Sequence, residues 1–126
     1  MLKRAIPLAY QSVPPKNEQD LNDKIEALLN SNSSDYRREY PSIPFALARS
    51  VPDHSTNAGL LIEAKYIRTN TTPSRVTEGI AADLVKYQNA THILFVVYDP
   101  ARGITDDQRF SQDFEKGYKC NVCIMR

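Results

Sequence analysis

The sequence predicts an α/β protein, an α+β sandwich in which a mixed central sheet is flanked by helices. Three observations lead to this fold class: helical apolar spacing at 17–30 and 72–89, a strand-length apolar run at 92–98, and strand patterns before and after these segments. Helices and sheets bury one face each, so we expect the helices to cover the faces of one sheet. The expected order is helix, three strands, helix and strand, followed by a C-terminal helix and strand.

The chain is expected to form one domain over residues 17–126, preceded by an irregular leader at 1–16. A chain of 126 residues leaves no room for two independent cores. Pro7, Pro14 and Pro15 prevent the leader from forming a continuous helix.

The composition is that of an ordinary soluble domain, with 41% hydrophobic and 25% charged residues. A net charge of +1 argues against a histone-like or tail-type nucleic-acid binder. The apolar runs are far shorter than the roughly 20 residues that span a bilayer. Pro7 precedes any long apolar segment, so a secretory signal is not expected. We expect a cytoplasmic protein that does not enter membranes.

The first helix is expected to begin after Asn17, a good N-cap, and to end within 30–34. Glu18 lies in the first turn, where the helix dipole favours a carboxylate. Positions 18, 21, 25 and 28 share one face, so Glu18 points the same way as the apolar stripe. The stripe consists of Leu21, Ile25, Leu28 and Leu29.

The next segment, 36–47, is expected to supply an edge strand broken by Pro41 and Pro44. A short strand at 52–56, a turn ending at Gly59 and a strong strand at 60–67 then form a hairpin.

The second helix is expected to start at the cap Thr72 with Pro73 in its first position and to run to about Asn89. Its inward face carries Val76, Ile80, Leu84 and Tyr87. The run 92–98 is apolar throughout, which is typical of a central strand that is covered on both faces. A third helix over 105–116 and a last strand over 118–125 complete the chain.

Cys120 and Cys123 form a lone Cys-x-x-Cys in the last strand. An odd spacing in a strand places the two side chains on opposite faces. His54 and His92 are the only histidines that could supply the further ligands of a structural zinc. We therefore do not expect a zinc or redox site.

Two charged residues interrupt the strand at 60–67. Period-two geometry places Glu63 and Lys65 on one face together with Leu61. Buried charges must pair with each other, reach solvent or serve a metal site. The strand alone favours a simple ion pair at the rim of the sheet.

The hairpin adds a second carboxylate, because it can bring Asp53 beside Glu63. Two carboxylates are the hard oxygen ligands that hold Mg²⁺ or Mn²⁺. Lys65 then stands within one strand step of the metal. Such an arrangement can cleave a phosphodiester, since a metal-bound water becomes a nucleophile and the lysine positions it or neutralises developing charge.

These residues resemble the signature of the PD-(D/E)XK nuclease superfamily, with Pro52-Asp53 as its first half and Glu63-Ala64-Lys65 as its second. The resemblance covers about residues 17–126 and implies a restriction-endonuclease-like core. Three segments look most like the modules of DpnII/MboI-like restriction and phage-defence nucleases: 62–68, 82–87 and 95–100. The resemblance implies that Asp53, Glu63 and Lys65 are catalytic and that Asp53 and Glu63 bind the metal.

Further residues are assigned partly from the resemblance and partly from their positions in the predicted elements. Many superfamily members add an acidic residue from the first helix, for which Glu18 is the candidate metal ligand. Asp83 and Tyr87 are typical of the subgroup, and a structural hydrogen bond between them is the expected role. His54 is discounted as a catalytic base, because adjacent strand residues face opposite ways. Candidate phosphate-binding residues are Arg68, Arg75 and Arg49.

The leading hypothesis is a Mg²⁺-dependent endonuclease, with Mn²⁺ as a substitute, that hydrolyses DNA in restriction or phage defence. It would act as a homodimer or as part of a larger multidomain or multisubunit assembly, since no target-recognition domain is evident. One alternative is an inactive nucleic-acid-binding or assembly module with the same fold. Another is a structural domain in which Glu63 and Lys65 form only an ion pair.

Overall fold

The computed structural model describes residues 14–32, 36–45, 48–56, 59–68 and 70–126, so most of the predicted leader lies outside the described residues. Helix α2 (Glu18–Asn32) begins where the sequence predicts. Oδ1 of Asn17 accepts a hydrogen bond from the backbone N–H of Asp20 at 2.7 Å, which is the role of an N-cap. Leu21 and Ile25 of its stripe are fully buried.

Five strands form a mixed sheet in the order β1-β4-β5-β6-β7. Strands β1 (Arg37–Arg38), β4 (His54–Ser55) and β5 (Leu60–Tyr66) pair antiparallel. Strands β5, β6 (His92–Tyr98) and β7 (Cys120–Met125) pair parallel. The expected mixed sheet and the predicted hairpin are therefore confirmed. Gly59 closes the hairpin with φ +87°, and a Cβ there would meet Oγ1 of Thr91 at 2.5 Å, so only glycine fits.

The single edge strand expected at 36–47 is wrong. Its first part is β1, whereas β2 (Ile43–Phe45) pairs antiparallel with β3 (Ala48–Ser50) in a separate two-stranded sheet. Proline cannot donate to a ladder and Glu39 has φ 52°, so Glu39 and Pro41 separate the two parts, whereas Pro44 lies within β2 and pairs with Arg49. The strand β3 was not predicted.

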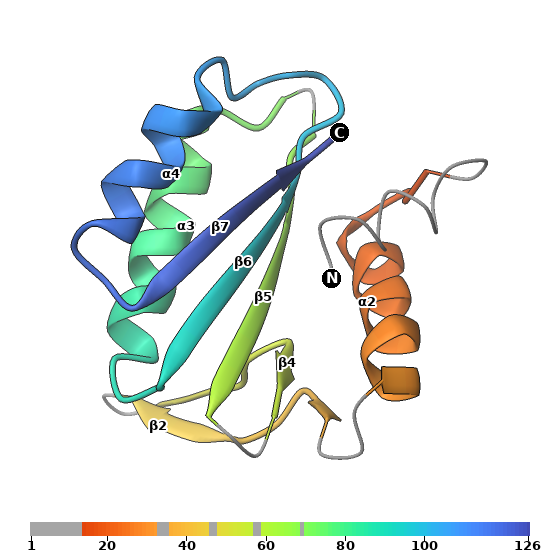
Figure 1. Cartoon of the computed structure of the whole chain (residues 1–126), viewed down its shortest axis with the longest axis vertical. Helices are drawn as coiled ribbons and strands as arrows, with labels where there is room; N and C mark the ends of the chain where they lie inside the picture. The colour runs from red at the N-terminus through yellow and green to blue at the C-terminus, as the bar shows by residue number, and fades with distance from the viewer. Residues whose placement is uncertain (1–13, 33–35, 46–47, 57–58, 69) are drawn as a thin grey trace.

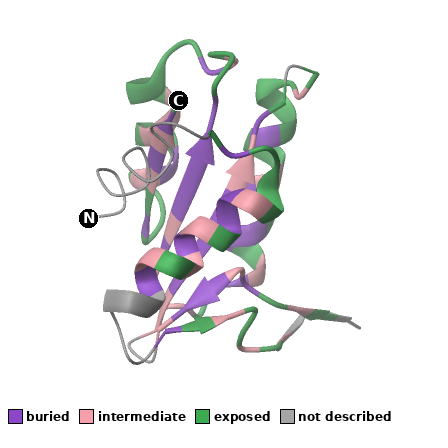
Figure 2. Cartoon of the chain, turned by 90° about the vertical axis from the view of Figure 1, so that its right-hand side faces the viewer, coloured by how far each residue is buried: buried purple, intermediate pink, exposed green. Residues whose placement is uncertain are grey.

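Helices cover both faces of the large sheet (Figure 1). Helix α2 lies on one face, and helices α3 (Pro73–Lys86) and α4 (Asp107–Glu115) lie on the other. Thr72 caps α3 by accepting from the backbone N–H of Arg75, and Asp106 caps α4 in the same way. Figure 2 shows buried residues along the strands and along the side of α2 that meets them.

Period-two geometry sorts the strand residues between the two faces. Ile62, Ala64 and Val96 pack with α2, whereas Leu61, Phe95 and Val97 pack with α3 and α4. Glu63 and Lys65 share the register of Leu61, so they belong to the α3 face.

The cysteines follow the same rule. Cys120 lies in the cluster under α3 and α4 and Cys123 in the cluster under α2, and the two cysteines are not joined to each other by a disulfide. The predicted opposite orientation is confirmed. Among the described helices, none has the length and apolar character needed to cross a bilayer.

Candidate active site

The β4–β5 hairpin places Asp53 and Glu63 side by side. His54 pairs with Ile62 in the antiparallel ladder, so the chain on either side brings residues 53 and 63 together. Oε1 of Glu63 accepts a hydrogen bond from the backbone N–H of Asp53 at 3.0 Å. Oδ2 of Asp53 accepts in turn from the backbone N–H of Ala64 at 2.9 Å. Each carboxylate is thus anchored to the backbone of the opposite arm of the hairpin.

Both carboxylates are disfavoured in their charged form. Burial, followed by the negative charges of Asp53 and Asp83, raises the pKa of Glu63 to about 8. Burial also raises the pKa of Asp53, although the backbone N–H of Ala64 and the charge of Lys65 oppose this shift. A bound cation would favour the ionised form of both groups.

Lys65 pairs with a carboxylate from helix α3. Its Nζ lies 2.6 Å from Oδ2 of Asp83, and both side chains are largely buried. That oxygen lacks a hydrogen bond of regular geometry, so the ion pair compensates its burial. Burial alone would lower the pKa of Lys65, but Asp83, Glu63 and Glu18 raise it above its usual value. The lysine therefore stays charged.

Gly79 of helix α3 lies beside the ammonium group of Lys65. A Cβ on Gly79 would lie 3.8 Å from Nζ of Lys65. Gly79 and Asp83 are one helical turn apart and share a face, so the ammonium group lies against the backbone of α3 and beside its carboxylate.

The sequence did not indicate that Asp83 pairs with Lys65. The sequence predicted a structural hydrogen bond between Asp83 and Tyr87, whereas the carboxylate pairs with Lys65. Four-residue spacing on the helix suggested the first pairing. The pairing with Lys65 depends on which face of the sheet α3 covers, and the one available signal was an acidic residue on the inward face of an apolar helix.

Glu18 lies near this group but does not join it closely. It is exposed at the first turn of α2. Partial burial of its carboxyl group and the charge of Asp53 raise the pKa of Glu18, whereas Lys65 and Arg68 lower it. Glu18 is thus within electrostatic reach of Asp53, Lys65, Asp83 and Arg68. We call the group formed by Asp53, Glu63, Lys65 and Asp83 the acidic cluster.

The other two predicted phosphate-binding residues lie on other elements of the fold. Arg49 in β3 donates to the hydroxyl and the carbonyl oxygens of Ser42 at 2.5 and 2.8 Å, so it braces the small sheet. Arg75 is exposed in the first turn of α3.

His54 points away from Asp53, as the alternation of strand residues predicts. It is fully buried beside α2, and Nε2 lies 2.7 Å from Oδ1 of Asn22. Burial, together with the positive charge of Arg38, lowers the pKa of His54 to about 4. The ring is therefore neutral near pH 7.

The acidic cluster fits a magnesium-like cation with two carboxylates. Among the described residues, no three Asp, Glu, His or Cys side chains are grouped closely enough to hold a metal by themselves. Mg²⁺ does not need such a group, because it commonly binds through one or two carboxylates together with waters and substrate phosphates. The hard oxygens of Asp53 and Glu63, both with raised pKa, match this donor set.

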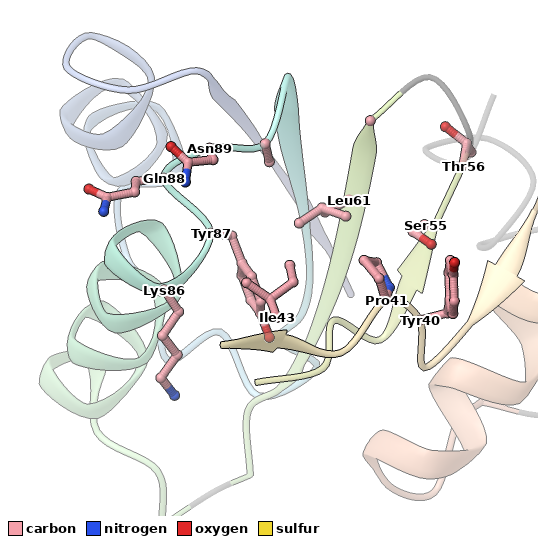
Figure 3. Close-up of a pocket in the computed structure, with 12 residues that line it drawn as sticks. Tyr40, Pro41, Ile43, Ser55, Thr56, Leu61, Lys86, Tyr87, Gln88 and Asn89 are labelled. Carbon is pink, nitrogen blue, oxygen red and sulfur yellow. The ribbon is translucent and has the colours of Figure 1, made fainter. Parts of the chain in front are cut away.

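A cavity of about 480 Å³ lies on the α3 side of the sheet. Figure 3 shows the residues around it, among them Leu61 of β5, Ile43 of β2 and Tyr87 at the end of α3. The residues of the acidic cluster do not line this cavity. Burial and then the charge of Glu63 raise the pKa of the hydroxyl group of Tyr87, so this lining residue is within electrostatic reach of the acidic cluster.

Comparison with known proteins yields one match. A family model described as REase_DpnII-MboI, for DpnII-MboI, matches residues 4–126. No curated protein and no solved structure matches the chain significantly.

Proposed function

The chain belongs to the DpnII–MboI restriction endonuclease family, and from this we propose that it hydrolyses phosphodiester bonds of DNA with Mg²⁺ or Mn²⁺ as cofactor. The family implies a DNA-cleaving hydrolase with DNA as its substrate. Dependence on a divalent cation, the residues that act and a role in restriction or phage defence are our proposals.

One observation carries the assignment of the active site: Asp53 and Glu63 are anchored next to each other by reciprocal bonds across the hairpin. Burial raises the pKa of both groups. Such a pair is costly for the metal-free fold, because like charges in a poorly solvated site repel. A divalent cation between them would turn this cost into a favourable interaction.

The residues have separate roles in the proposed reaction. Asp53 and Glu63 would hold the cation, with Glu18 as a further ligand from α2, and a bound cation would lower the pKa of its water and polarise the phosphoryl group. Lys65 would position the nucleophile or neutralise charge that develops on the phosphate. Asp83 keeps the ammonium of Lys65 in place and charged.

Basic residues near the acidic cluster would bind the DNA backbone. Arg68 lies two residues after the end of β5 and is exposed, and its charge lowers the pKa of Glu18. Arg68 is therefore the first candidate for a phosphate contact, with Arg75 and Arg49 as more distant ones. A homodimer or a larger assembly would allow two such sites to cut both strands.

A cleavage assay tests the proposal and separates it from its alternatives. Supercoiled plasmid and single-stranded DNA would be incubated with the protein in Mg²⁺, in Mn²⁺ and in EDTA. The proposal predicts nicked or linear plasmid with either cation and intact plasmid in EDTA. Plasmid that is bound but never cut would instead support an inactive DNA-binding module. A protein that neither cuts DNA nor binds Mn²⁺ would support the structural ion pair.

A further inference from the structure

A chain of buried polar groups lies behind the hairpin and has no role in the proposed reaction. The hydroxyl of Tyr36 lies 2.5 Å from Nδ1 of His54, and Nε2 of the same ring lies 2.7 Å from Oδ1 of Asn22. His54 is fully buried, and Tyr36 and Asn22 are only 6% and 8% exposed. Buried polar groups cost free energy unless all of them are satisfied. Three residues from three separate segments thus depend on one another.

The chain of polar groups ends at a proposed metal ligand. The side-chain amide of Asn22 lies within hydrogen-bonding reach of the carboxyl group of Asp53, where it opposes the burial that raises the pKa of that group. Asn22 lies on α2 and Asp53 precedes β4, so this contact joins the helix to the active-site arm of the hairpin. Asn22 therefore contacts both His54 and Asp53.

When Asp53 is ionised, as cation binding requires, its carboxylate fixes the direction of each hydrogen bond between Asn22, His54 and Tyr36. An ionised carboxylate only accepts, so Asn22 must turn its NH₂ group toward Asp53 and its Oδ1 toward His54. Oδ1 also only accepts, so Nε2 of His54 must carry the ring proton. In a neutral ring Nδ1 is then the acceptor, and the hydroxyl of Tyr36 donates to it.

We propose that Tyr36, His54 and Asn22 are positioning residues that hold the carboxylate of Asp53 in the orientation that binds the catalytic cation. This inference rests on the proposed function. The hydroxyl of Tyr36 donates to Nδ1 and so stabilises the tautomer with its proton on Nε2, Nε2–H donates to Oδ1 of Asn22, and the amide of Asn22 donates to Asp53. Without the hydroxyl, Nδ1 is a buried acceptor with no donor, so this tautomer loses part of its stabilisation and Asn22 can turn its carbonyl oxygen toward the carboxylate, which would repel it.

The tautomer of His54 can be measured without any metal. Long-range ¹H–¹⁵N correlation spectra of the metal-free protein distinguish the two ring nitrogens, and a His54→Gln variant identifies which signals belong to His54 and which to His92. We expect a neutral ring with its proton on Nε2, and loss of this single state in Tyr36→Phe. A ring in wild type with its proton on Nδ1 would overturn the proposal.

The affinity for Mn²⁺ tests the link to Asp53. Removing a group that orients a metal ligand typically weakens metal binding by about 10- to 100-fold, and we expect this loss in Tyr36→Phe and in Asn22→Ala by titration calorimetry. Tyr98→Phe is the matched control, because Tyr98 lies in the same buried cluster as Tyr36 and is 8% exposed. A purely structural role would lower the melting temperature of both Tyr→Phe variants and leave their Mn²⁺ affinity unchanged.

The outcomes separate this inference from the proposed function. Wild-type protein that binds Mn²⁺ and cuts DNA, together with folded Tyr36→Phe and Asn22→Ala variants of unchanged affinity, would overturn the positioning role alone. Wild-type protein that binds no Mn²⁺ would overturn both proposals. If one of the two variants does not fold, the other variant and the tautomer of the wild-type ring still decide.

Discussion

The ammonium group of Lys65 on strand β5 lies 2.6 Å from the carboxylate of Asp83 on helix α3. This ion pair joins the strand of the nuclease signature to the helix that follows it. Its burial means that neither charge is well solvated, so each depends on the other. Lys65 therefore pairs with Asp83, whereas the sequence alone suggests Glu63 as its partner.

Removing Lys65 alone should destabilise the fold. Lys65→Met leaves Asp83 as an unpaired, largely buried charge, which typically lowers the free energy of unfolding by about 3–5 kcal/mol. In the double variant Lys65→Met, Asp83→Asn neither charge remains, so most of this loss should be recovered. Urea denaturation followed by circular dichroism measures all four proteins of the cycle. Additive effects of the two substitutions would show that the pair is not coupled.

Removing only the carboxylate should change the titration of the lysine. Asp83 opposes the lowering effect of burial on the pKa of Lys65, so Asp83→Asn should let that pKa fall. Lys65 then loses its proton at a lower pH, and the alkaline limit of DNA cleavage should move down with it. The measurement is the cleavage rate of plasmid against pH, in wild type and variant. An unchanged alkaline limit in an active Asp83→Asn protein would contradict a charged Lys65 as the active form.

The parts of the fold that depend on local pattern could be predicted from the sequence. The caps Asn17 and Thr72 mark where α2 and α3 begin, and the alternation in 60–67 gives the correct face for Glu63 and Lys65. The division of 36–47 into two sheets could not be predicted, because it depends on where β2 finds a partner.

The candidate site shows the same division. The hairpin brings Asp53 to Glu63 through a short turn, so the sequence was sufficient for that contact. Asp83 and Asn22 come from helices on opposite faces of the sheet, and their contacts depend on how those helices pack. Polar residues on otherwise apolar helix faces were the available signal, but the pattern does not show which group each one meets.

Asp53→Asn should show how much the repulsion between Asp53 and Glu63 lowers the stability of the metal-free protein, because it removes the charge and keeps the size of the side chain. The amide oxygen can still accept from the backbone N–H of Ala64, and the loss of the repulsion from Glu63 offsets the loss of the carboxylate oxygen that accepts from the Asn22 amide. We expect the metal-free variant to melt at or above the temperature of wild type and to lose the rise in melting temperature that Mn²⁺ gives wild type. Asp113→Asn, at an exposed position of α4, should leave both properties unchanged. Marked destabilisation by Asp53→Asn in EDTA would contradict the repulsion.

The stability of the metal-free protein should fall as the pH rises above neutrality. The pKa of Glu63 is about 8 instead of 4.5, so between these values the folded protein holds a proton that the unfolded chain has released. More protons bound in the folded state mean that the free energy of unfolding falls as pH rises. His54 acts in the opposite direction, because its pKa is about 4 instead of 6.5.

The two effects oppose each other below pH 6.5, so the decline should be clearest from there to about pH 8. Urea denaturation in EDTA across this range measures the decline, and Glu63→Gln should flatten it. Equal slopes for wild type and Glu63→Gln would show that Glu63 does not titrate in this window.

The most direct test of the proposed active site is the cleavage of plasmid DNA by Glu63→Gln in the presence of Mn²⁺. The substitution keeps the size of the side chain and an oxygen that can accept from the backbone N–H of Asp53, but it removes the proposed metal-binding carboxylate. Glu78→Gln is the control, because Glu78 occupies an exposed position on helix α3. We predict that wild type and Glu78→Gln cut the plasmid, and that folded Glu63→Gln leaves it as intact as wild type does in EDTA. Undiminished cleavage by folded Glu63→Gln would contradict the assignment of Asp53, Glu63 and Lys65 as the active site.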